Sequence, residues 1–201
     1  MNEQGSEAWL ADRMGLCTAS CFADVLAKGQ GLTRKKYMLK LVTERLTGKY
    51  LETYSNAHMD RGNEQEPHAR IAYEMLTGNI VEETGFIRHS ILKAGGSPDG
   101  LIDSDGLIEI KSVIPTVQIE TIEKGGYPSG HKAQIQGCLW VSGRDWCDFI
   151  SYSPDLPENL SLYTHRVVRD DEYIANLEVE IVRFLDELEV MYNRLLEFKR
   201  K

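Results

Sequence analysis

Three side chains that could hydrolyse a phosphodiester bond lie close together in the sequence. Asp99 belongs to the segment 97–100 (SPDG), and Glu109 and Lys111 follow it closely, separated from each other by one residue. Two neighbouring carboxylates stay ionised only if a cation offsets their repulsion. Mg²⁺ or Mn²⁺ accepts such ligands together with water and phosphate oxygens. A lysine beside them could orient an attacking water or stabilise the transition state. The spacing therefore predicts metal-assisted hydrolysis.

A β-hairpin would bring these side chains together. Two apolar runs flank the segment 103–106 (DSDG), and an Asp-Gly pair in this setting is typical of a hairpin turn. Side chains alternate along a strand, so Glu109 and Lys111 should share a face. A turn at 104–106 would place Asp99 opposite residues 110–112, and the Ile110 carbonyl would be a further oxygen ligand. An isolated E-x-K pair is more often a solvated strand face, and the preceding SPDG segment favours catalysis here.

Helices and short strands are predicted on both sides of this hairpin. Apolar periodicity and capping residues predict helices over 6–14, 33–47, 67–76, 115–122, 131–141 and 171–198, and a short helix opened by Thr18-Ala19-Ser20. Apolar runs between turn residues predict strands over 80–83, 86–91, 94–102, 107–113, 146–152 and 160–168. The expected sheet order runs from the strands of residues 80–91 to 94–102 and then to 107–113. The mixture predicts an α/β fold.

Several polar residues in these helices have two explanations each. Arg13 stands near the helix start that carries Ser20, and a helix N-terminus with hydroxyl side chains could bind a terminal phosphate. Simple capping beside a surface arginine explains the same residues. The basic run 34–36 could contact a DNA backbone or be solvated. Glu66 could be only a partner of a helix dipole, and Gln134 could bind water or phosphate or be merely exposed.

Composition restricts the class of protein. The 201 residues are expected to form one domain over 1–201, with 42% hydrophobic and 27% charged residues. The start has neither a basic segment nor an apolar core, and no run approaches the ~20 apolar residues that span a bilayer, so we expect a cytoplasmic protein with no membrane partner. The four cysteines lack the spacing of a zinc or iron–sulfur site. The net charge of −8 argues against non-specific nucleic-acid binding over the whole surface, but not against a local basic groove.

Five motifs, in a fixed order, are spread over nearly the whole chain. Asp99…Glu109-Ile110-Lys111 resembles the PD-(D/E)xK nuclease signature, and together the motifs resemble the lambda-exonuclease family (YqaJ-type viral recombinases), a branch of those nucleases. The motifs are Trp9-x-x-x-Arg13-x-Gly15 with Thr18-Ala19-Ser20, Gly62-x-x-x-Glu66-x-x-Ala69, the catalytic segments 97–101 and 107–111, Ala133-Gln134-x-Gln136-x-x-x-Trp140-Val141, and Tyr152-Ser153-Pro154. Such an ordered set is far more specific than E-x-K alone. The resemblance implies a restriction-endonuclease-like core with a mixed central β-sheet flanked by α-helices.

The resemblance also implies roles for particular residues. Asp99, Glu109 and the Ile110 carbonyl would bind Mg²⁺, with Mn²⁺ as a substitute and two ions in each active site. The remaining catalytic roles would fall to Lys111, which activates water, Glu66, which completes the acidic cluster, and Gln134, which positions water or the scissile phosphate. The 5′-phosphate pocket would consist of Arg13, Ser20 and Ser97. Met59 would help to separate the strands. The loop at 29–31 departs from the family, which puts a strand-guiding basic residue there in doubt.

The function implied by the resemblance is processive 5′→3′ digestion of linear duplex DNA that carries a 5′-phosphate end. The products would be 5′-mononucleotides and a 3′ single strand, which a single-strand annealing protein would use in recombination. A homotrimeric ring around DNA would supply processivity by topology, which suits an acidic protein. Two alternatives of the same fold are a structure-specific DNA endonuclease and a CRISPR-associated iron–sulfur nuclease, the latter disfavoured by the cysteine spacing. A non-catalytic DNA-binding module is a third, disfavoured by the intact Asp99, Glu109 and Lys111.

Overall fold

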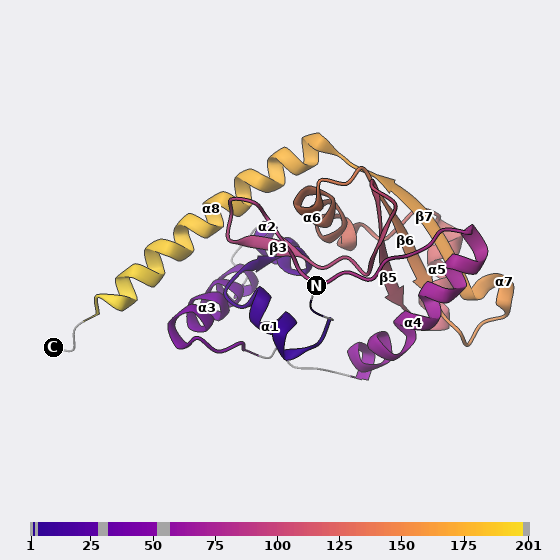
Figure 1. Ribbon diagram of the computed structural model, residues 1–201, viewed down its shortest axis with the longest axis horizontal. Helices are drawn as coiled ribbons and strands as arrows, with labels where there is room; N and C mark the ends of the chain where they lie inside the picture. The colour runs from indigo at the N-terminus through magenta and orange to yellow at the C-terminus, as the bar shows by residue number, and fades with distance from the viewer. Residues whose placement is uncertain (1, 3, 28–31, 52–56, 199–201) are drawn as a thin grey trace.

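The computed structural model describes residues 2, 4–27, 32–51 and 57–198, without the side chains of 57–60 and 63. A four-stranded sheet of order β4-β5-β6-β7 occupies one side of the molecule (Figure 1). Its strands are β4 (Gly100–Ile102), β5 (Gly106–Ser112), β6 (Trp146–Tyr152) and β7 (Leu162–Val168). The β5–β6 pair is parallel and the other two pairs are antiparallel, so the sheet is mixed. The mixed α/β architecture predicted from the sequence is confirmed.

The two faces of this sheet are covered by different helices. On one face, Ala69 and Tyr73 of α4 (Ala57–Thr77) pack with Ile108 and Ile110 of β5. On the other, α6 (Lys132–Ser142) belongs to the same core cluster as Leu107. Because side chains alternate along β5, Glu109 and Lys111 share the α6 face with Leu107. The hairpin therefore directs the two charged residues toward α6, together with Leu107, and Ile108 and Ile110 toward α4.

A small second sheet connects the N-terminal region to the catalytic hairpin. Its order is β1-β3-β2, formed by β1 (Cys17–Thr18), β3 (Ala94–Gly96) and β2 (Ile87–Arg88). β1 and β3 are parallel, and the Cys17 N–H donates to the Lys93 carbonyl at 2.9 Å. β3 ends directly before Ser97 and β1 follows α1 (Glu7–Arg13). This pairing brings Arg13 and the 97–100 segment together although they are far apart in the sequence.

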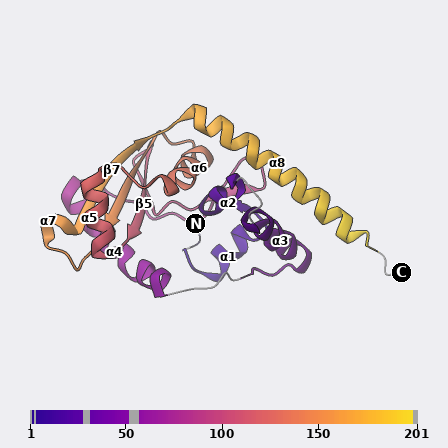
Figure 2. The same cartoon turned by 180° about the vertical axis from the view of Figure 1, so that it is seen from behind.

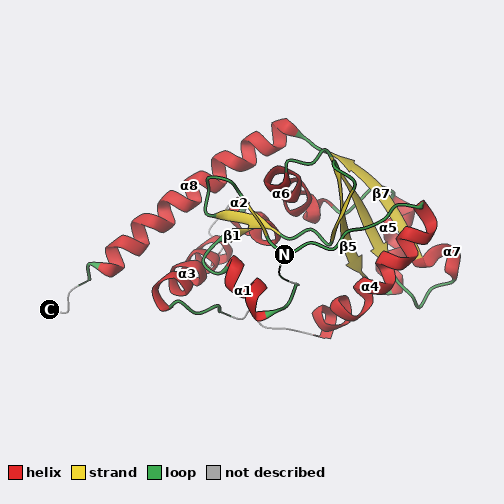
Figure 3. Cartoon of the chain, viewed as in Figure 1, coloured by secondary structure: helices red, strands yellow, loops and turns green. Residues whose placement is uncertain are grey.

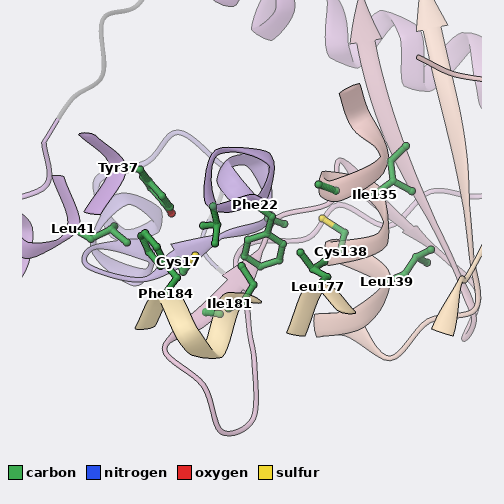
Figure 4. Close-up of a cluster of buried hydrophobic side chains, with 14 of the residues drawn as sticks. Cys17, Phe22, Tyr37, Leu41, Ile135, Cys138, Leu139, Leu177, Ile181 and Phe184 are labelled. Atoms are coloured by element: carbon green, nitrogen blue, oxygen red, sulfur yellow. The ribbon is translucent and has the colours of Figure 1, made fainter. Parts of the chain in front are cut away.

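The remaining helices surround the two sheets (Figures 2 and 3). They are η1 (Ala19–Cys21), α2 (Phe22–Leu26), α3 (Leu32–Thr47), α5 (Pro115–Lys124), η2 (Ser129–His131), α7 (Glu158–Ser161) and α8 (Asp171–Leu196). The larger core cluster joins α2, α3, α6 and α8, and Figure 4 shows Phe22 near Cys138 and Ile181 in it. Tyr37 stacks on Phe184, with 5.6 Å between ring centroids. The C-terminal helix thus helps to hold the N-terminal helices in place.

Four expected elements, one helix and three strands, differ from the structure. The helix expected over 67–76 is α4, which begins at Ala57, so Glu66 lies in its middle and not near its start. Proline usually marks a helix start or a break, because it lacks an N–H and its ring clashes with the preceding turn, but α4 continues through Pro67. The strand expected over 94–102 is divided between β3 and β4, because Pro98 has no N–H for a ladder. Of the strands expected over 80–83 and 86–91, only β2 and a bridge between Glu82 and Leu101 form.

The register of the hairpin also differs by a small shift. Ile102 pairs with Gly106, so the turn comprises residues 103–105 and not 104–106. Gly100 pairs with Ile108, and the Asp99 N–H donates to the Ile108 carbonyl at 3.1 Å. Asp99 therefore lies beside residues 108–110, slightly earlier than the expected 110–112. A turn type that the Asp-Gly pair does not define by itself accounts for the shift.

Candidate active site

Glu109 is the fully buried centre of the candidate site. Its side chain is 0% exposed, and its Oε1 accepts hydrogen bonds from the Lys111 ammonium and, at 2.5 Å, from Gln134 Nε2 on α6. Its Oε2 is also buried but has no hydrogen-bond partner among the described residues. A buried, unpaired carboxylate oxygen is costly unless something else satisfies it. Lys111 and Gln134 thus hold one oxygen of Glu109 and leave the other available.

Asp99 is fixed next to Glu109 by the hairpin backbone. Its Oδ2 accepts a hydrogen bond from the Ile110 N–H at 2.6 Å. Asp99 and Glu109 are close enough to influence each other's charge, because Asp99 contributes to raising the pKa of Glu109. The structure therefore brings together Asp99, Glu109, Ile110, Lys111 and Gln134.

Glu66 completes the acidic cluster from the other side, on α4. Its Oε1 accepts from Arg70 Nη2 at 2.8 Å, one helical turn further along, and Arg70 also pairs with Glu83. The negative charge of Asp99 acts on Glu66. Arg70 was not predicted as a site residue, although the i,i+4 spacing to Glu66 is a recognisable signal for such a pair.

Burial dominates the electrostatics of the three carboxyl groups. Burial raises the pKa of Glu109 to about 7, opposed by the charge of Lys111, and burial together with Asp99 raises the pKa of Glu66 to about 7. Burial also raises the pKa of Asp99. Burial disfavours the charge of Lys111, but the carboxylates of Glu109 and Asp99 outweigh it and raise the lysine pKa. The raised pKa values show that Lys111 and Arg70 do not fully offset the cost of burying three carboxylates together.

The donor atoms of this cluster suit a hard divalent cation. No three His, Cys, Asp or Glu side chains of the described residues form a ready-made metal cluster. The unpaired Oε2 of Glu109 is nevertheless an oxygen donor in need of a partner, and carboxylate oxygens are preferred ligands of Mg²⁺ and Mn²⁺. Burial raises the pKa of the neighbouring Cys138 thiol, which therefore stays protonated and is a poor ligand for soft metals. The residues present fit Mg²⁺.

Arg13, Ser20 and Ser97 lie around the indole of Trp9. The Arg13 guanidinium stacks over the Trp9 ring at 4.1 Å from the centroid, and Trp9 Nε1 donates to Ser97 Oγ at 3.0 Å. Arg13 Nη2 approaches Ser20 Oγ at 3.5 Å. Ser6 caps α1 by accepting from the Trp9 N–H, which fixes the start of the helix that carries the pair. Trp9, quoted above only as part of a motif, is the residue that connects Arg13 to Ser97.

A single groove of about 1620 Å³ connects the acidic cluster with this basic cluster. Glu66, Asp99, Arg13 and Ser20 all line it. A linear anion could therefore contact both clusters at once. His131 is close enough to Lys111 for the lysine charge, together with burial, to lower the histidine pKa to about 4, so His131 is neutral at neutral pH. Sequence reasoning missed His131 because only the fold brings it near Lys111.

Two predictions concern parts of the chain that the structure does not describe. The side chain of Met59 and the loop at 29–31 lie outside the described residues. Within the described residues, no helix is long and apolar enough to cross a membrane.

Comparison with known proteins shows the relationships of the chain. Residues 8–145 match the family described as the YqaJ-like viral recombinase domain. The alkaline exonuclease LHK-Exo from Laribacter hongkongensis is 43% identical with a TM-score of 0.88, and the alignment covers 94% of this chain and 96% of that one. Its complex with dAMP gives 44% identity over the same shares and a TM-score of 0.89. A phage-related exonuclease from Haemophilus somnus 129PT, at 15% identity, 90% and 95% coverage and a TM-score of 0.66, shares the fold. No curated protein matches significantly.

Proposed function

The chain belongs to the YqaJ-like viral recombinase family, and from this we propose that it is a DNA exonuclease. We propose further that it requires Mg²⁺, digests linear duplex DNA processively from 5′ ends and releases 5′-mononucleotides. The observation that carries the proposal is the single groove lined by both the acidic cluster around Asp99 and the arginine pocket around Arg13. The 43% identity to an alkaline exonuclease supports the reaction. The dAMP in the related complex is a deoxynucleoside monophosphate, the kind of product proposed here.

Each residue of the acidic cluster has a definite task in this proposal. Asp99, Glu109 and the Ile110 carbonyl would hold Mg²⁺, and Glu66 would add charge from α4. The bound ion would lower the pKa of a coordinated water and offset the charge on the phosphoryl oxygens. The Lys111 ammonium, fixed against Glu109, stabilises the charge that accumulates on the phosphate. Gln134 holds Glu109 from α6 and positions water or the scissile phosphate.

The polarity of digestion follows from end recognition in the groove. A 5′-terminal phosphate bound by Arg13, Ser20 and Ser97 would place the next phosphodiester toward Asp99 and Glu66. Arginine suits this role because its charge persists at all relevant pH values and its planar group matches a phosphate. The stacking on Trp9 holds the guanidinium in place before DNA arrives. Cleavage at the next phosphodiester would release one nucleotide and leave a new 5′-phosphate.

The partners of the reaction follow from its product. Removal of nucleotides from one strand leaves a 3′ single strand, which a single-strand annealing protein would bind. We propose a homotrimeric ring, in which topology keeps an acidic protein on its substrate.

Labelled linear duplex DNA tests this function. One set carries a label in the 5′-terminal nucleotide and another at the 3′ end, and each is digested with Mg²⁺, with Mn²⁺ and with EDTA. The proposal predicts immediate release of 5′ label as mononucleotide, late release of 3′ label, and none in EDTA. Early release of 3′ label would contradict the polarity, and release in EDTA would contradict the requirement for metal.

A further inference from the structure

Helix α3 presents two lysines to the groove that Asp99, Glu66 and Arg13 also line. Lys36 and Lys40 are one helical turn apart and line the groove together with Tyr50. The Lys40 ammonium lies 4.9 Å from the centroid of the Tyr50 ring. This arm of the groove adjoins Arg13 but carries none of the residues assigned to catalysis or to the terminal phosphate.

The structure divides the basic run 34–36 into residues with different surroundings. Arg34 is engaged with Glu187 on α8, with its two guanidinium nitrogens 2.6 and 3.0 Å from the carboxylate oxygens. Lys35 is exposed and is not among the residues that line the groove. Lys36 is also exposed, but it faces the groove. Of the three residues in the run, only Lys36 is therefore placed to bind a ligand in the groove.

Acidic groups in the same arm do not cancel this charge. Asp24 and Glu44 also line the groove. The Glu44 carboxylate accepts from the Gly15 N–H at 2.8 Å and the Leu51 N–H at 3.1 Å, and the Lys40 ammonium is further away, at 3.8 Å. Lys36 has no ion pair within the described part of the chain. The arm therefore carries Lys40, which forms an ion pair with Glu44, and Lys36, which is unpaired among the described residues, and it adjoins the positive charge of Arg13.

The groove is larger than one nucleotide requires. Pockets for drug-sized ligands hold roughly 300–1000 Å³, whereas this groove holds about 1620 Å³. In Figure 1, α1, which carries Arg13, lies between α4 and α3. The arm formed by α3 thus lies on the side of the phosphate pocket away from Glu66. An anionic chain could continue past Arg13 into it.

We propose that Lys36 and Lys40, beside Tyr50, form a second phosphate subsite that binds a DNA phosphodiester other than the 5′-terminal phosphate. The inference rests on the proposed function, since it takes DNA as the ligand. The phosphodiester can come from a 5′ overhang of the digested strand or from the 3′-ended strand that leaves the duplex. Both sources present the same chemistry to the two ammonium groups.

Salt-dependent binding to labelled duplex ends tests the subsite without catalysis. Blunt, 5′-overhang and 3′-overhang ends are titrated in EDTA with the wild type, Lys36→Ala, Lys36→Ala/Lys40→Ala, and the matched control Lys35→Ala. Each lost phosphate contact lowers the slope of log K against log salt by about 0.9 on duplex and about 0.7 on single strands. Because the two lysines share one phosphodiester, we expect a decrease of about 0.7 to 0.9 for the double variant, a smaller decrease for Lys36→Ala, and none for the control. The overhang that shows the larger loss identifies the strand.

Equal slopes for the double variant and for Lys35→Ala on all three ends would overturn the subsite. Because Lys36 is exposed, its single variant is expected to fold, and it keeps the test decisive if Lys40→Ala is unstable. Nucleotide release with Mg²⁺ is measured on the same proteins. A wild type that binds ends through these lysines but releases no nucleotide would overturn the proposed exonuclease and leave the subsite intact. Release by the wild type with unchanged slopes would overturn the subsite alone.

Discussion

Glu109 and Lys111 form a largely buried charge pair at the centre of the candidate site, and the charge state of each depends on the other. The buried Glu109 needs the ammonium to stay ionised, and Lys111 keeps its proton because the carboxylates outweigh its burial. Lys111 therefore acts as a charged group and not as a neutral base. It holds Glu109, and in the proposed mechanism it stabilises negative charge on the phosphate.

Neutralising either residue is expected to abolish cleavage. Glu109→Gln removes a proposed metal ligand, and Lys111→Ala removes the cation beside it, so nucleotide release should fall by about 10²–10³-fold or more. Release is measured on 5′-labelled duplex, with circular dichroism to confirm folding. Lys124→Ala is the matched control, because that side chain is 72% exposed on α5. Substantial residual cleavage in both variants would remove them from the active site.

Arg13→Ala is expected to reduce discrimination between end types. The variant loses the guanidinium stacked on Trp9, which is the proposed charged ligand for a terminal phosphate. The ratio of kcat/KM for 5′-phosphate over 5′-hydroxyl ends should therefore fall about 10-fold or more, in line with one charged hydrogen bond. Arg183→Ala, on an exposed part of α8, should leave the ratio unchanged. An unchanged ratio in Arg13→Ala would exclude it from the pocket.

The buried carboxyl groups predict how the metal-free protein responds to pH. The pKa values of Glu66 and Glu109 rise from 4.5 to about 7 on folding. Groups with raised folded pKa values stabilise the protein below their unfolded pKa, and this stabilisation is lost as pH rises through the folded value. In EDTA, the melting temperature should therefore fall between pH 5 and pH 8, and less steeply in Glu109→Gln. Identical slopes for the two proteins would contradict the assignment.

At the scale of elements, the hairpin was predictable because its signals are local. The Asp-Gly turn and the alternation of residues 107–113 predict antiparallel strands, and with them the shared face of Glu109 and Lys111. The pairing of β1 with β3 could not be predicted, since it joins Cys17 to Ala94 through backbone groups that every sequence has. The beginning of α4 was missed because residues 57–66 lack an apolar stripe. Glu66 was therefore found by resemblance and not by its place in a helix.

The packing of α6 against the N-terminal helices should determine where Gln134 lies, and a substitution at this contact tests that. A Cβ at Gly137 would lie 2.5 Å from the Phe22 ring, so Gly137→Ala forces α6 away from α2. Overpacking of this kind costs about 1–3 kcal/mol, partly offset by about 1 kcal/mol of helix propensity. Urea denaturation should show lower stability, and nucleotide release should fall as Gln134 shifts. Gly130→Ala is the control, because nothing lies within 4 Å of its added Cβ. Equal stability of the two variants would contradict this packing.

At the scale of the whole molecule, a negative net charge is compatible with DNA binding because basic residues are gathered in one groove. The chain carries −8 overall, yet Arg13, Lys36 and Lys40 line one groove. DNA bound there would be held by few contacts, so weak affinity alone could not keep the enzyme on its substrate through many cycles. Enclosure of the duplex by a ring would keep the enzyme on its substrate.

The ring predicts a particular mass in solution. Light scattering after size exclusion should give three times the 22.8 kDa of one chain at all concentrations that are practical to measure. Digestion should then be processive, so a trap of unlabelled duplex added after the start should not stop reactions in progress. A monomer in solution, or immediate arrest by the trap, would contradict the ring.

The most direct test of the central claim compares linear duplex DNA with the same DNA as a closed circle, both in Mg²⁺. The account predicts mononucleotide release from the linear form with 5′-phosphate ends, little release from 5′-hydroxyl ends, and an intact circle. Nicking of the circle would contradict it, because a cluster that cleaves without an end would belong to an endonuclease, and neither the phosphate pocket nor the ring would then be required.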